Sequence, residues 1–276
     1  YDPKGEGGHQ GGVVAAPVPA RAAVKTSARI VIAGSGLGGI AVANRLAGML
    51  DGARITVVDR KEEHNYQPGY TLVATGVWPV EKVRDRNADF LPANVEWVQD
   101  MVAGFDPAAN TVVTAGGQRI AYDFLVVAIG VQLDFAQIQG MDVGAIGSNG
   151  LTSVYPSPQA AQATWAAMQA FTAKGGNAVM TLPATPLKCA GAPLKMTFML
   201  RDRLLKAGTL GSSKINFQSA LGNVFGVKVV NDNVLERWKA LGIDVAFSRK
   251  LTAIDIGARR ATFVSPEGET QETPYD

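Results

Sequence analysis

The chain has 276 residues, which is long enough for one large or two medium domains, each with its own hydrophobic core. Its formal net charge of +2 gives no indication of a surface that binds nucleic acid, and we expect no nucleic-acid partner. A single cysteine excludes an internal disulfide, and with only two scattered histidines we expect no metal site.

Residues 1–27 are rich in Gly, Ala, Pro and Val and lack an apolar run of signal-peptide length, so we predict a flexible leader. The following stretch, 30–50, carries one charged residue, Arg45. Four glycines within its first ten residues indicate a turn inside it rather than a membrane span.

The first half of the chain alternates between short strands and a helix. β-Branched runs predict buried strands at 29–33 and 54–58, and an Ala- and Leu-rich segment between them predicts a helix at 37–50. This order is typical of a βαβ unit with parallel strands. Further strands are expected at 95–105, 111–120 and 124–128, with a hairpin turn at Gly116-Gly117.

A connector at about 131–156, which contains Gly and Pro, suggests a domain boundary. Beyond it the alternation of helices and strands resumes, which predicts a second α/β unit. Its helices are expected at 159–173, 192–206 and 231–241, and its strands at 178–182, 215–220, 245–247, 251–256 and 261–264.

The loop Gly34–Gly39 fits the pattern G-x-G-x-x-G, directly after a predicted strand and at the start of a predicted helix. Gly34 allows the tight turn, Gly36 lets the backbone approach a pyrophosphate, and Gly39 lets the helix pack close to the strand. Asp59 follows Gly39 by 20 residues, at the end of the second strand, where an acidic side chain accepts a hydrogen bond from a ribose hydroxyl. The pattern predicts a Rossmann-like dinucleotide-binding domain.

The segment Tyr122–Gly130 is a strand that ends in Ala-x-Gly, and it resembles the second FAD fingerprint of the two-dinucleotide flavoprotein superfamily. By itself it is equally typical of a buried strand that ends at a glycine. Together with the first motif it favours FAD over NAD.

The segment after the strand at 177–182 lacks a second glycine-rich loop. It runs from Pro183 to Pro193, and prolines have no N–H donors with which to bind a pyrophosphate. We infer that a nicotinamide site is missing. Cys189 stands there instead, where Lys188, Lys195 and the start of a predicted helix favour a thiolate. The alternative is a buried structural cysteine.

Five segments resemble sulfide:quinone oxidoreductases of the mitochondrial type, and the resemblance runs from about Arg29 to the last residue. The most specific is the peptide around the cysteine. In chain order the segments are His64–Tyr70, Val73–Gly76, Ile146–Asn149, Lys188–Pro193 and Leu221–Val227.

This resemblance implies an α/β chain with two Rossmann-like dinucleotide-binding domains, the FAD/NAD(P)-binding flavoprotein fold. The FAD-binding domain is expected at 28–150, and its second fingerprint ends at Gly130. The domain that carries the redox cysteine is expected at 151–276. The resemblance also implies a role for each site residue. The FAD pyrophosphate would be lined by Gly34, Gly36, Leu37, Gly38 and Gly39, and the ribose would be held by Asp59. Gln67 would contact FAD, Val102 would meet the adenine, and Cys189 would carry a persulfide.

The family works with a pair of redox cysteines, and the second is expected in a later part of the chain, outside this sequence. The same later part would supply the quinone pocket and the membrane-facing helices. The resemblance therefore implies sulfide, a sulfur acceptor and quinone as partners. It also implies peripheral attachment to the mitochondrial inner membrane or the bacterial cytoplasmic membrane.

Three alternatives remain open. The flavoprotein subunit of a flavocytochrome c sulfide dehydrogenase shares the fold and the sulfide chemistry but passes electrons to a haem partner. A type-II NADH dehydrogenase would need the glycine-rich loop that is missing here. The third is a non-catalytic flavin-binding module with Cys189 buried in its core. Alkylation of the native protein distinguishes this alternative, because a buried structural thiol resists the reagent.

Overall fold

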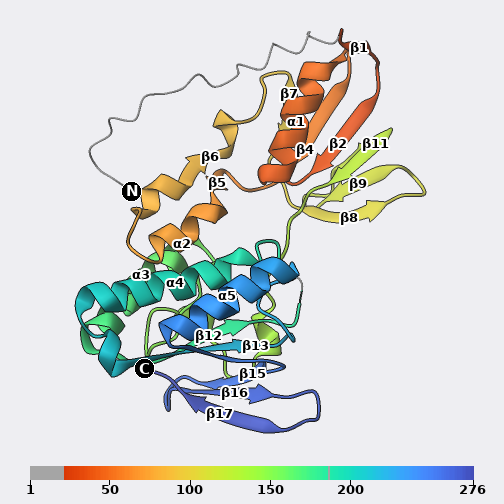
Figure 1. The fold of residues 1–276 in the computed structure, drawn as a ribbon. Coiled ribbons are helices and arrows are strands. Elements are labelled where there is room, and N and C mark those ends of the chain that lie inside the picture. The colour runs from red at the N-terminus through yellow and green to blue at the C-terminus, as the bar shows by residue number, and fades with distance from the viewer. Residues whose placement is uncertain (1–21, 186) are drawn as a thin grey trace, which may run out of the picture. The chain divides into compact units, whose positions relative to one another are not determined.

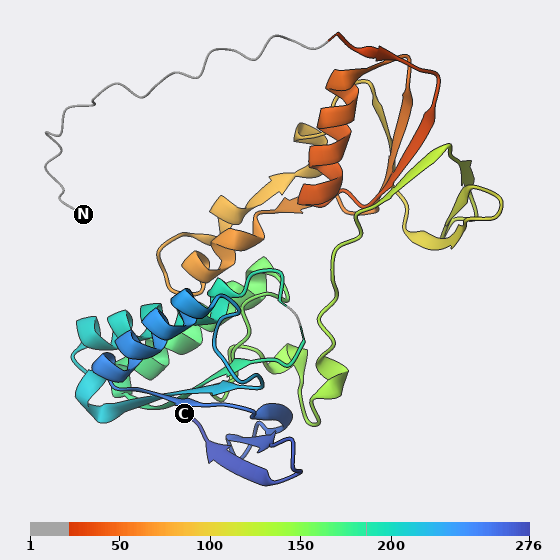
Figure 2. The same cartoon turned by 45° about the vertical axis from the view of Figure 1, so that its right-hand side comes forward.

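The structure is a computed structural model that describes residues 22–185 and 187–276. The chain folds into two compact units (Figures 1 and 2). Among the described residues, the first unit consists of 22–60 together with Phe90–Ile129, and the second unit of Lys61–Asp89 and Gly130–Asp276. This division differs from the predicted boundary after residue 150, because the segments 61–89 and 130–150 pack with the second unit.

The first unit is built on a four-stranded parallel sheet in the order β11-β2-β4-β7. The strands are β2 (Arg29–Ala33), β4 (Arg54–Val58), β7 (Val95–Val98) and β11 (Phe124–Val127). Helix α1 (Leu37–Met49) covers one face, where Ile32 and Val57 of the strands pack with Ala43 of the helix. The predicted βαβ unit is therefore confirmed, because β2 and β4, which precede and follow the helix in sequence, pair in parallel.

A three-stranded antiparallel sheet packs on the other face, where Val31 and Val58 meet Val112 and Tyr122. Its strands are β8 (Val102–Asp106), β9 (Thr111–Thr114) and β10 (Arg119–Ala121). The predicted hairpin turn at Gly116-Gly117 is confirmed, since it joins β9 to β10.

The single strand predicted at 95–105 is wrong, because the chain breaks between β7 and β8 at Asp100. The Asp100 carboxylate accepts hydrogen bonds from the N–H groups of Met101 at 2.7 Å and Gly116 at 2.9 Å. These bonds, with one from the Thr114 hydroxyl as the largest cause, hold the pKa of Asp100 below its usual value. The turn lets the chain leave one sheet and enter the other.

Most of the predicted leader, up to residue 21, lies outside the described residues. Its described end forms a short strand, β1 (Val24–Lys25), which pairs in parallel with β3 (Leu50–Asp51) at the end of α1. This part of the leader prediction is therefore wrong. The strand is held by backbone hydrogen bonds, which cannot be predicted from its Ala- and Pro-rich composition.

The second unit contains a parallel sheet in the order β12-β13-β14. Helices α3, α4 and α5 lie on one side of this sheet, and an antiparallel sheet of β15, β16 and β17 lies on the other (Figures 1 and 2). The strands are β12 (Gly176–Leu182), β13 (Ser213–Ser219), β14 (Ile243–Ala246), β15 (Lys250–Asp255), β16 (Arg260–Val264) and β17 (Thr270–Pro274). The helices are α3 (Pro158–Lys174), α4 (Gly191–Ala207) and α5 (Lys228–Leu241).

The core of the second unit lies between the parallel sheet and these helices. Trp238 of α5 is fully buried against Phe217 of β13, with ring centroids 4.7 Å apart, and against Phe198 of α4 at 5.8 Å. Helix α4 buries Leu200 and Leu204, four residues apart, on the face that meets the sheet. The position of α4 thus follows from its apolar stripe.

The segment 61–89 packs into this same core with Tyr70, Val73 and Val83. It consists of short elements that the sequence reading did not predict: β5 (Glu63–Asn65), η1 (Gln67–Gly69), α2 (Tyr70–Val73), η2 (Val80–Val83), β6 (Arg84–Arg86) and η3 (Asn87–Asp89). Burial of these apolar side chains, worth about 1.5–3 kcal/mol each, is what attaches the segment to the second unit.

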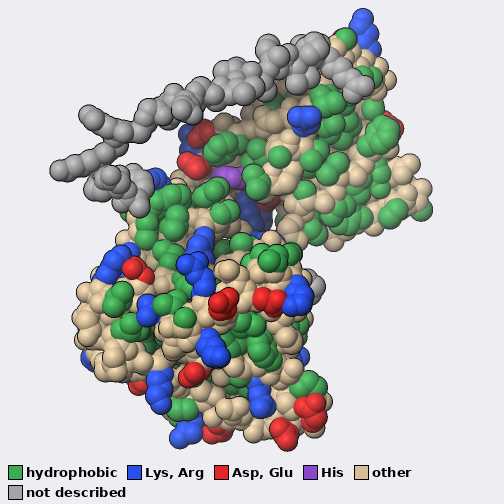
Figure 3. Space-filling model, viewed as in Figure 1, with side chains coloured by type: hydrophobic (Ala, Val, Ile, Leu, Met, Phe, Trp, Pro, Cys, Tyr) green, Lys and Arg blue, Asp and Glu red, His purple; other side chains and the backbone are tan. Residues whose placement is uncertain are grey.

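Large hydrophobic side chains are exposed on both units (Figure 3), among them Leu37 and Phe124 on the first and Val229 on the second. Within the described residues, no helix combines the length and the apolar character needed to cross a membrane.

Replacement of Trp238 tests the core of the second unit. Trp238→Ala is expected to lower the free energy of unfolding by about 3–5 kcal/mol, because it leaves a large cavity against Phe217. Trp238→Phe should cost only about 1 kcal/mol, since the ring is retained and the buried indole N–H, which has no partner among the described residues, is removed. Urea unfolding followed by circular dichroism measures both. Equal losses for the two variants would contradict the packing described here.

Candidate functional site

The glycine loop of the first unit follows β2 and is held close to β11. Gly34 has a φ of +103°, and a Cβ atom there would lie 2.5 Å from the carbonyl oxygen of Ala128. Its N–H donates to the Val58 carbonyl at 2.9 Å. The prediction that Gly34 serves a tight turn is supported, because both the backbone angle and the neighbouring strand exclude a side chain.

Gly39 has a different constraint from Gly36. A Cβ atom at Gly39 would lie 1.8 Å from the Gly34 carbonyl oxygen, so helix α1 can lie this close to its own loop only without a side chain there. A Cβ atom at Gly36 would have no neighbour within 4 Å. The space beside the Gly36 backbone is therefore open to a ligand.

The first turn of α1 presents free donors at the same place. Gly36 is the N-cap residue and supplies no side-chain hydrogen bond, and the first turn contains no acidic residue. Among the described residues, no acceptor bonds the N–H groups of Leu37, Gly38 and Gly39. These donors and the helix dipole suit a phosphate.

Asp59 lies directly after β4 and faces the glycine loop. Its Oδ2 accepts a hydrogen bond from the Ser35 N–H at 2.7 Å, and its carbonyl oxygen accepts one from the Trp97 indole at 2.9 Å. The sequence predicted the place of Asp59 but not these two partners, which come from separate parts of the chain. They fix the carboxylate beside the loop, where a ribose would follow the phosphates.

Val102 and Gly130 are the other candidate cofactor residues near this unit. Val102 is the first residue of β8, opposite Thr114 of β9, and precedes a bulge in that pairing. Gly130 follows β11 with a φ of +75° and is exposed. Both positions permit backbone contacts, and their roles toward FAD remain predictions.

Cys189 belongs to the second unit, in the loop between β12 and α4. The thiol is exposed, and the Cys189 carbonyl accepts a hydrogen bond from the Ala192 N–H at 3.1 Å as the helix begins. The alternative of a cysteine buried in the core is thus wrong. Cys189 lies in the loop that follows the carboxyl end of the parallel strand β12, and loops of this kind bind ligands in α/β proteins.

Lys188 connects this loop to the segment 61–89. Its ammonium group donates a hydrogen bond to Oε1 of Gln67, which lies in η1. The structure therefore brings the candidate FAD contact Gln67 and the residue before Cys189 together within one unit. The two residues are 121 positions apart in the sequence, so this contact could not be predicted from the sequence alone.

Tyr155 is a neighbour of Cys189 that sequence reasoning missed. Burial, and second to it the charge of the nearby Cys189, raises the pKa of Tyr155 to about 12. Its ring stacks on that of the buried Tyr70, with centroids 6.0 Å apart. The phenol is therefore neutral at physiological pH, and its position is set by the core.

Paired substitutions in the glycine loop test these constraints. Gly39→Ala is expected to lower the free energy of unfolding by several kcal/mol, because the new methyl group overlaps the Gly34 carbonyl. Gly36→Ala should change it by about 0.5 kcal/mol or less, since nothing lies near the added atom. Thermal unfolding of both variants measures the difference. A Gly39→Ala variant as stable as the parent would show that the helix and the loop are not in contact.

Comparisons with known proteins agree with this geometry. A family model described as pyridine nucleotide-disulphide oxidoreductase matches residues 28–179. The mitochondrial sulfide:quinone oxidoreductase of Mus musculus is 34% identical over 258 residues, covering 91% of this chain and 56% of that protein. The mitochondrial sulfide:quinone oxidoreductase of Dictyostelium discoideum is 34% identical over 255 residues, covering 92% and 55%.

A solved structure of the sulfide:quinone oxidoreductase from the hyperthermophilic bacterium Aquifex aeolicus superimposes with a TM-score of 0.75 at 25% identity, covering 90% of this chain and 56% of that chain. The chain thus spans about half the length of the curated relatives it matches. The predicted flavoprotein fold and the resemblance to sulfide:quinone oxidoreductases are confirmed. The chain belongs to the pyridine nucleotide-disulphide oxidoreductase family.

Proposed function

We propose that the protein carrying this chain is an FAD-dependent sulfide:quinone oxidoreductase and that Cys189 is its sulfur-carrying residue. The observation that carries the proposal is the exposed thiol in the loop after β12, which begins with Pro183 and has no glycine-rich motif. The similarity to curated sulfide:quinone oxidoreductases over nine-tenths of this chain supports the same chemistry.

The first unit would hold FAD through its glycine loop. The open backbone at Gly36 and the free N–H groups of Leu37 and Gly38 fit a pyrophosphate, and Asp59 fits the ribose. Gln67, Val102 and Gly130 are proposed as further contacts. A bound FAD would supply two-electron redox chemistry, and this chain contributes its binding and orientation.

Removal of the Asp59 carboxylate tests the cofactor site. Asp59→Ala is expected to weaken FAD binding by about 1.5–3 kcal/mol, because the charge-assisted hydrogen bond to the ribose is lost. Titration of the apoprotein with FAD, followed by flavin fluorescence, measures the affinity.

Asp59→Asn is the matched control, since it retains an oxygen that can accept the Ser35 N–H hydrogen bond and should keep the loop in place. The ribose role would be wrong if Asp59→Ala bound FAD as tightly as the parent protein.

The sulfide chemistry proposed for Cys189 is an exchange between a sulfide ion and an S–S bond. In it, HS⁻ attacks the Cys189 sulfur in a disulfide with a second cysteine, which lies outside this chain. The new S–S bond makes Cys189 a persulfide, the old bond breaks, and the second cysteine leaves as a thiolate that holds the electron pair. The second cysteine would give two electrons through FAD to quinone as it re-forms an S–S bond with Cys189. That bond would form either through the persulfide sulfur, as a trisulfide, or directly once a sulfur acceptor has removed that sulfur.

Lys188 and Tyr155 assist this step in different ways. Lys188 precedes the reacting sulfur, and its bond to Gln67 fixes the loop that presents the thiol. The neutral Tyr155 hydroxyl is a donor near Cys189. Quinone reduction would take place at a membrane, to which the protein would attach peripherally, at the mitochondrial inner membrane or the bacterial cytoplasmic membrane.

The haem-linked and NADH-linked alternatives differ from this proposal in their electron partner. The relatives in mouse and Dictyostelium discoideum are named for quinone, which favours quinone over a haem subunit. The loop from Pro183 lacks a glycine-rich motif for a second pyrophosphate, and its prolines have no N–H donors, which disfavours NADH. Rapid reduction of the flavin by NADH would favour the dehydrogenase instead.

Cys189→Ser in the full-length protein tests the proposed sulfur carrier. The hydroxyl is close in size to the thiol and the site is exposed, so the fold and FAD should be retained. Sulfide-dependent flavin reduction should fall by at least about 10³-fold, because a hydroxyl is a poor nucleophile and cannot form a persulfide. Stopped-flow flavin absorbance after mixing with sulfide measures the rate.

Oxidation of chemically reduced flavin by quinone serves as the internal control, and this rate should be unchanged in the variant. If sulfide reduced the flavin of Cys189→Ser as fast as that of the parent, Cys189 would have no role in the reaction and the proposal would be abandoned.

A further inference from the structure

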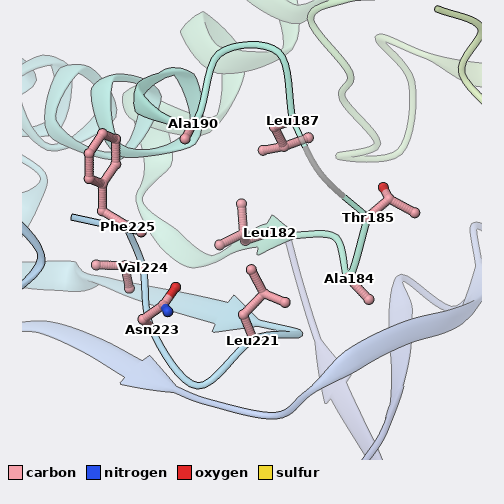
Figure 4. Close-up of a pocket in the computed structure, with 10 residues that line it drawn as sticks. Leu182, Ala184, Thr185, Leu187, Ala190, Leu221, Asn223, Val224 and Phe225 are labelled. Carbon is pink, nitrogen blue, oxygen red and sulfur yellow. The ribbon is translucent and has the colours of Figure 1, made fainter. Parts of the chain in front are cut away.

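The loop that carries Cys189 borders an apolar pocket of about 220 Å³ within the second unit. This pocket lies between the loops after β12 and β13, with Leu182 at the end of β12 and Ala190 at the start of α4 (Figure 4). Cys189 itself is not among the residues that line it. Because Leu187 and Ala190 belong to the cysteine loop, this pocket is part of the region described above.

A different pocket, of about 270 Å³, lies between the segment 61–89 and helix α3. Trp78 of the segment and Trp165 of α3 form part of its wall, so we call it the indole pocket. None of its lining residues is a candidate cofactor residue or belongs to the cysteine loop. The function proposed above therefore does not account for the indole pocket.

The wall of the indole pocket is mostly apolar and is anchored in the core of the second unit. Val73 and Val80 line it and are buried in that core. Trp78 and Trp165 are partly buried and pack against the same core. Gln162 of α3 adds a carboxamide to the lining. A ligand would thus meet aromatic and aliphatic surface with few polar groups.

Two glycines hold the indole rings in place. Gly76 has a φ of +68°, and a Cβ atom there would lie 2.3 Å from Cζ2 of Trp165. A Cβ atom at Gly69 would lie 3.0 Å from Cζ3 of Trp78. Each ring therefore rests on backbone that carries no side chain, and the wall is preformed.

Two cations lie on the indole rings that line the pocket. The Lys82 ammonium nitrogen is 4.7 Å from the centroid of the Trp78 ring, and the Arg203 guanidinium carbon is 5.3 Å from that of Trp165. Among the described residues, neither cation forms a salt bridge. Asp202, next to Arg203 in sequence, is paired with a lysine of α4 instead.

The indole pocket thus combines apolar walls with positive charge beside them. No carboxylate is among its lining residues, and Glu81, next to Lys82 in sequence, is exposed to water. A flat apolar ring would gain contact with the indoles, and a negative group on that ring would gain two cations without a carboxylate partner. The volume lies below the range of about 300–1,000 Å³ typical of drug-sized ligands, so a molecule of one or two rings fits.

We propose that the indole pocket binds a small aromatic carboxylate. The aromatic ring of the ligand lies against Trp78 and Trp165. Its carboxylate pairs with Lys82 and Arg203, which give the site its preference for an anion. This binding site goes beyond the function proposed for Cys189 and does not depend on it.

Two probes with the same ring and opposite charge test the proposal. Titration calorimetry of the full-length protein compares 2-naphthoate with 2-naphthylmethylammonium. We expect a Kd at least about tenfold lower for the carboxylate, because the two cations attract an anion and repel an ammonium group. The proposal is wrong if 2-naphthoate fails to bind at about 1 mM, or if the ammonium probe binds equally well or more tightly.

Removal of the cations tests whether the probe binds in this pocket. Lys82→Gln and Arg203→Gln should each raise the Kd for 2-naphthoate at least about threefold, and the double variant at least about tenfold. Lys250→Gln is the matched control, because Lys250 is exposed on β15, on the other side of the parallel sheet from α3 (Figure 1).

Circular dichroism checks that each variant is folded. Because Lys82 is exposed, Lys82→Gln should retain the fold and supplies the test even where Arg203→Gln does not. If Lys82→Gln weakens the binding of 2-naphthoate no more than Lys250→Gln does, the probe binds elsewhere and the proposal is overturned.

Discussion

The parallel pairing of strands is the constraint on which both halves of the molecule depend. In the first unit it aligns the ends of β2 and β4, so that the glycine loop and Asp59 meet. In the second unit it aligns Leu182 of β12 with Ser219 of β13, so that the loops that follow them face each other. In each unit, the candidate functional residues thus lie in the loops that follow the carboxyl ends of parallel strands.

The two edges differ in what their loops contain. After β2, glycines expose backbone N–H groups that suit a pyrophosphate. At the corresponding place after β12, the loop begins with Pro183, carries Cys189 and borders an apolar pocket. The same strand–loop–helix arrangement therefore supports cofactor binding in one unit and, in our proposal, sulfur chemistry in the other.

Features that depend on local sequence were predictable. The glycine spacing placed the turn at Gly34 and the start of α1. Apolar runs placed the strands of both parallel sheets except β7, which the sequence merged with β8. Features that depend on distant contacts were not predictable. The segment 61–89 joins the second unit through side chains such as Tyr70, whose ring stacks on that of Tyr155, far away in the sequence. The polar strand β17 has no apolar alternation and is defined only by its pairing with β16.

The central claim is that Cys189 carries sulfur taken from sulfide. The most direct measurement is mass spectrometry of the peptide that contains Cys189, after the full-length protein has been exposed to sulfide without an acceptor and its thiols have been alkylated. Our account predicts a peptide heavier by one sulfur atom, and reversal of this change when an acceptor thiol is added. A Cys189 peptide that is alkylated but never gains sulfur, while sulfide still reduces the flavin, would contradict it.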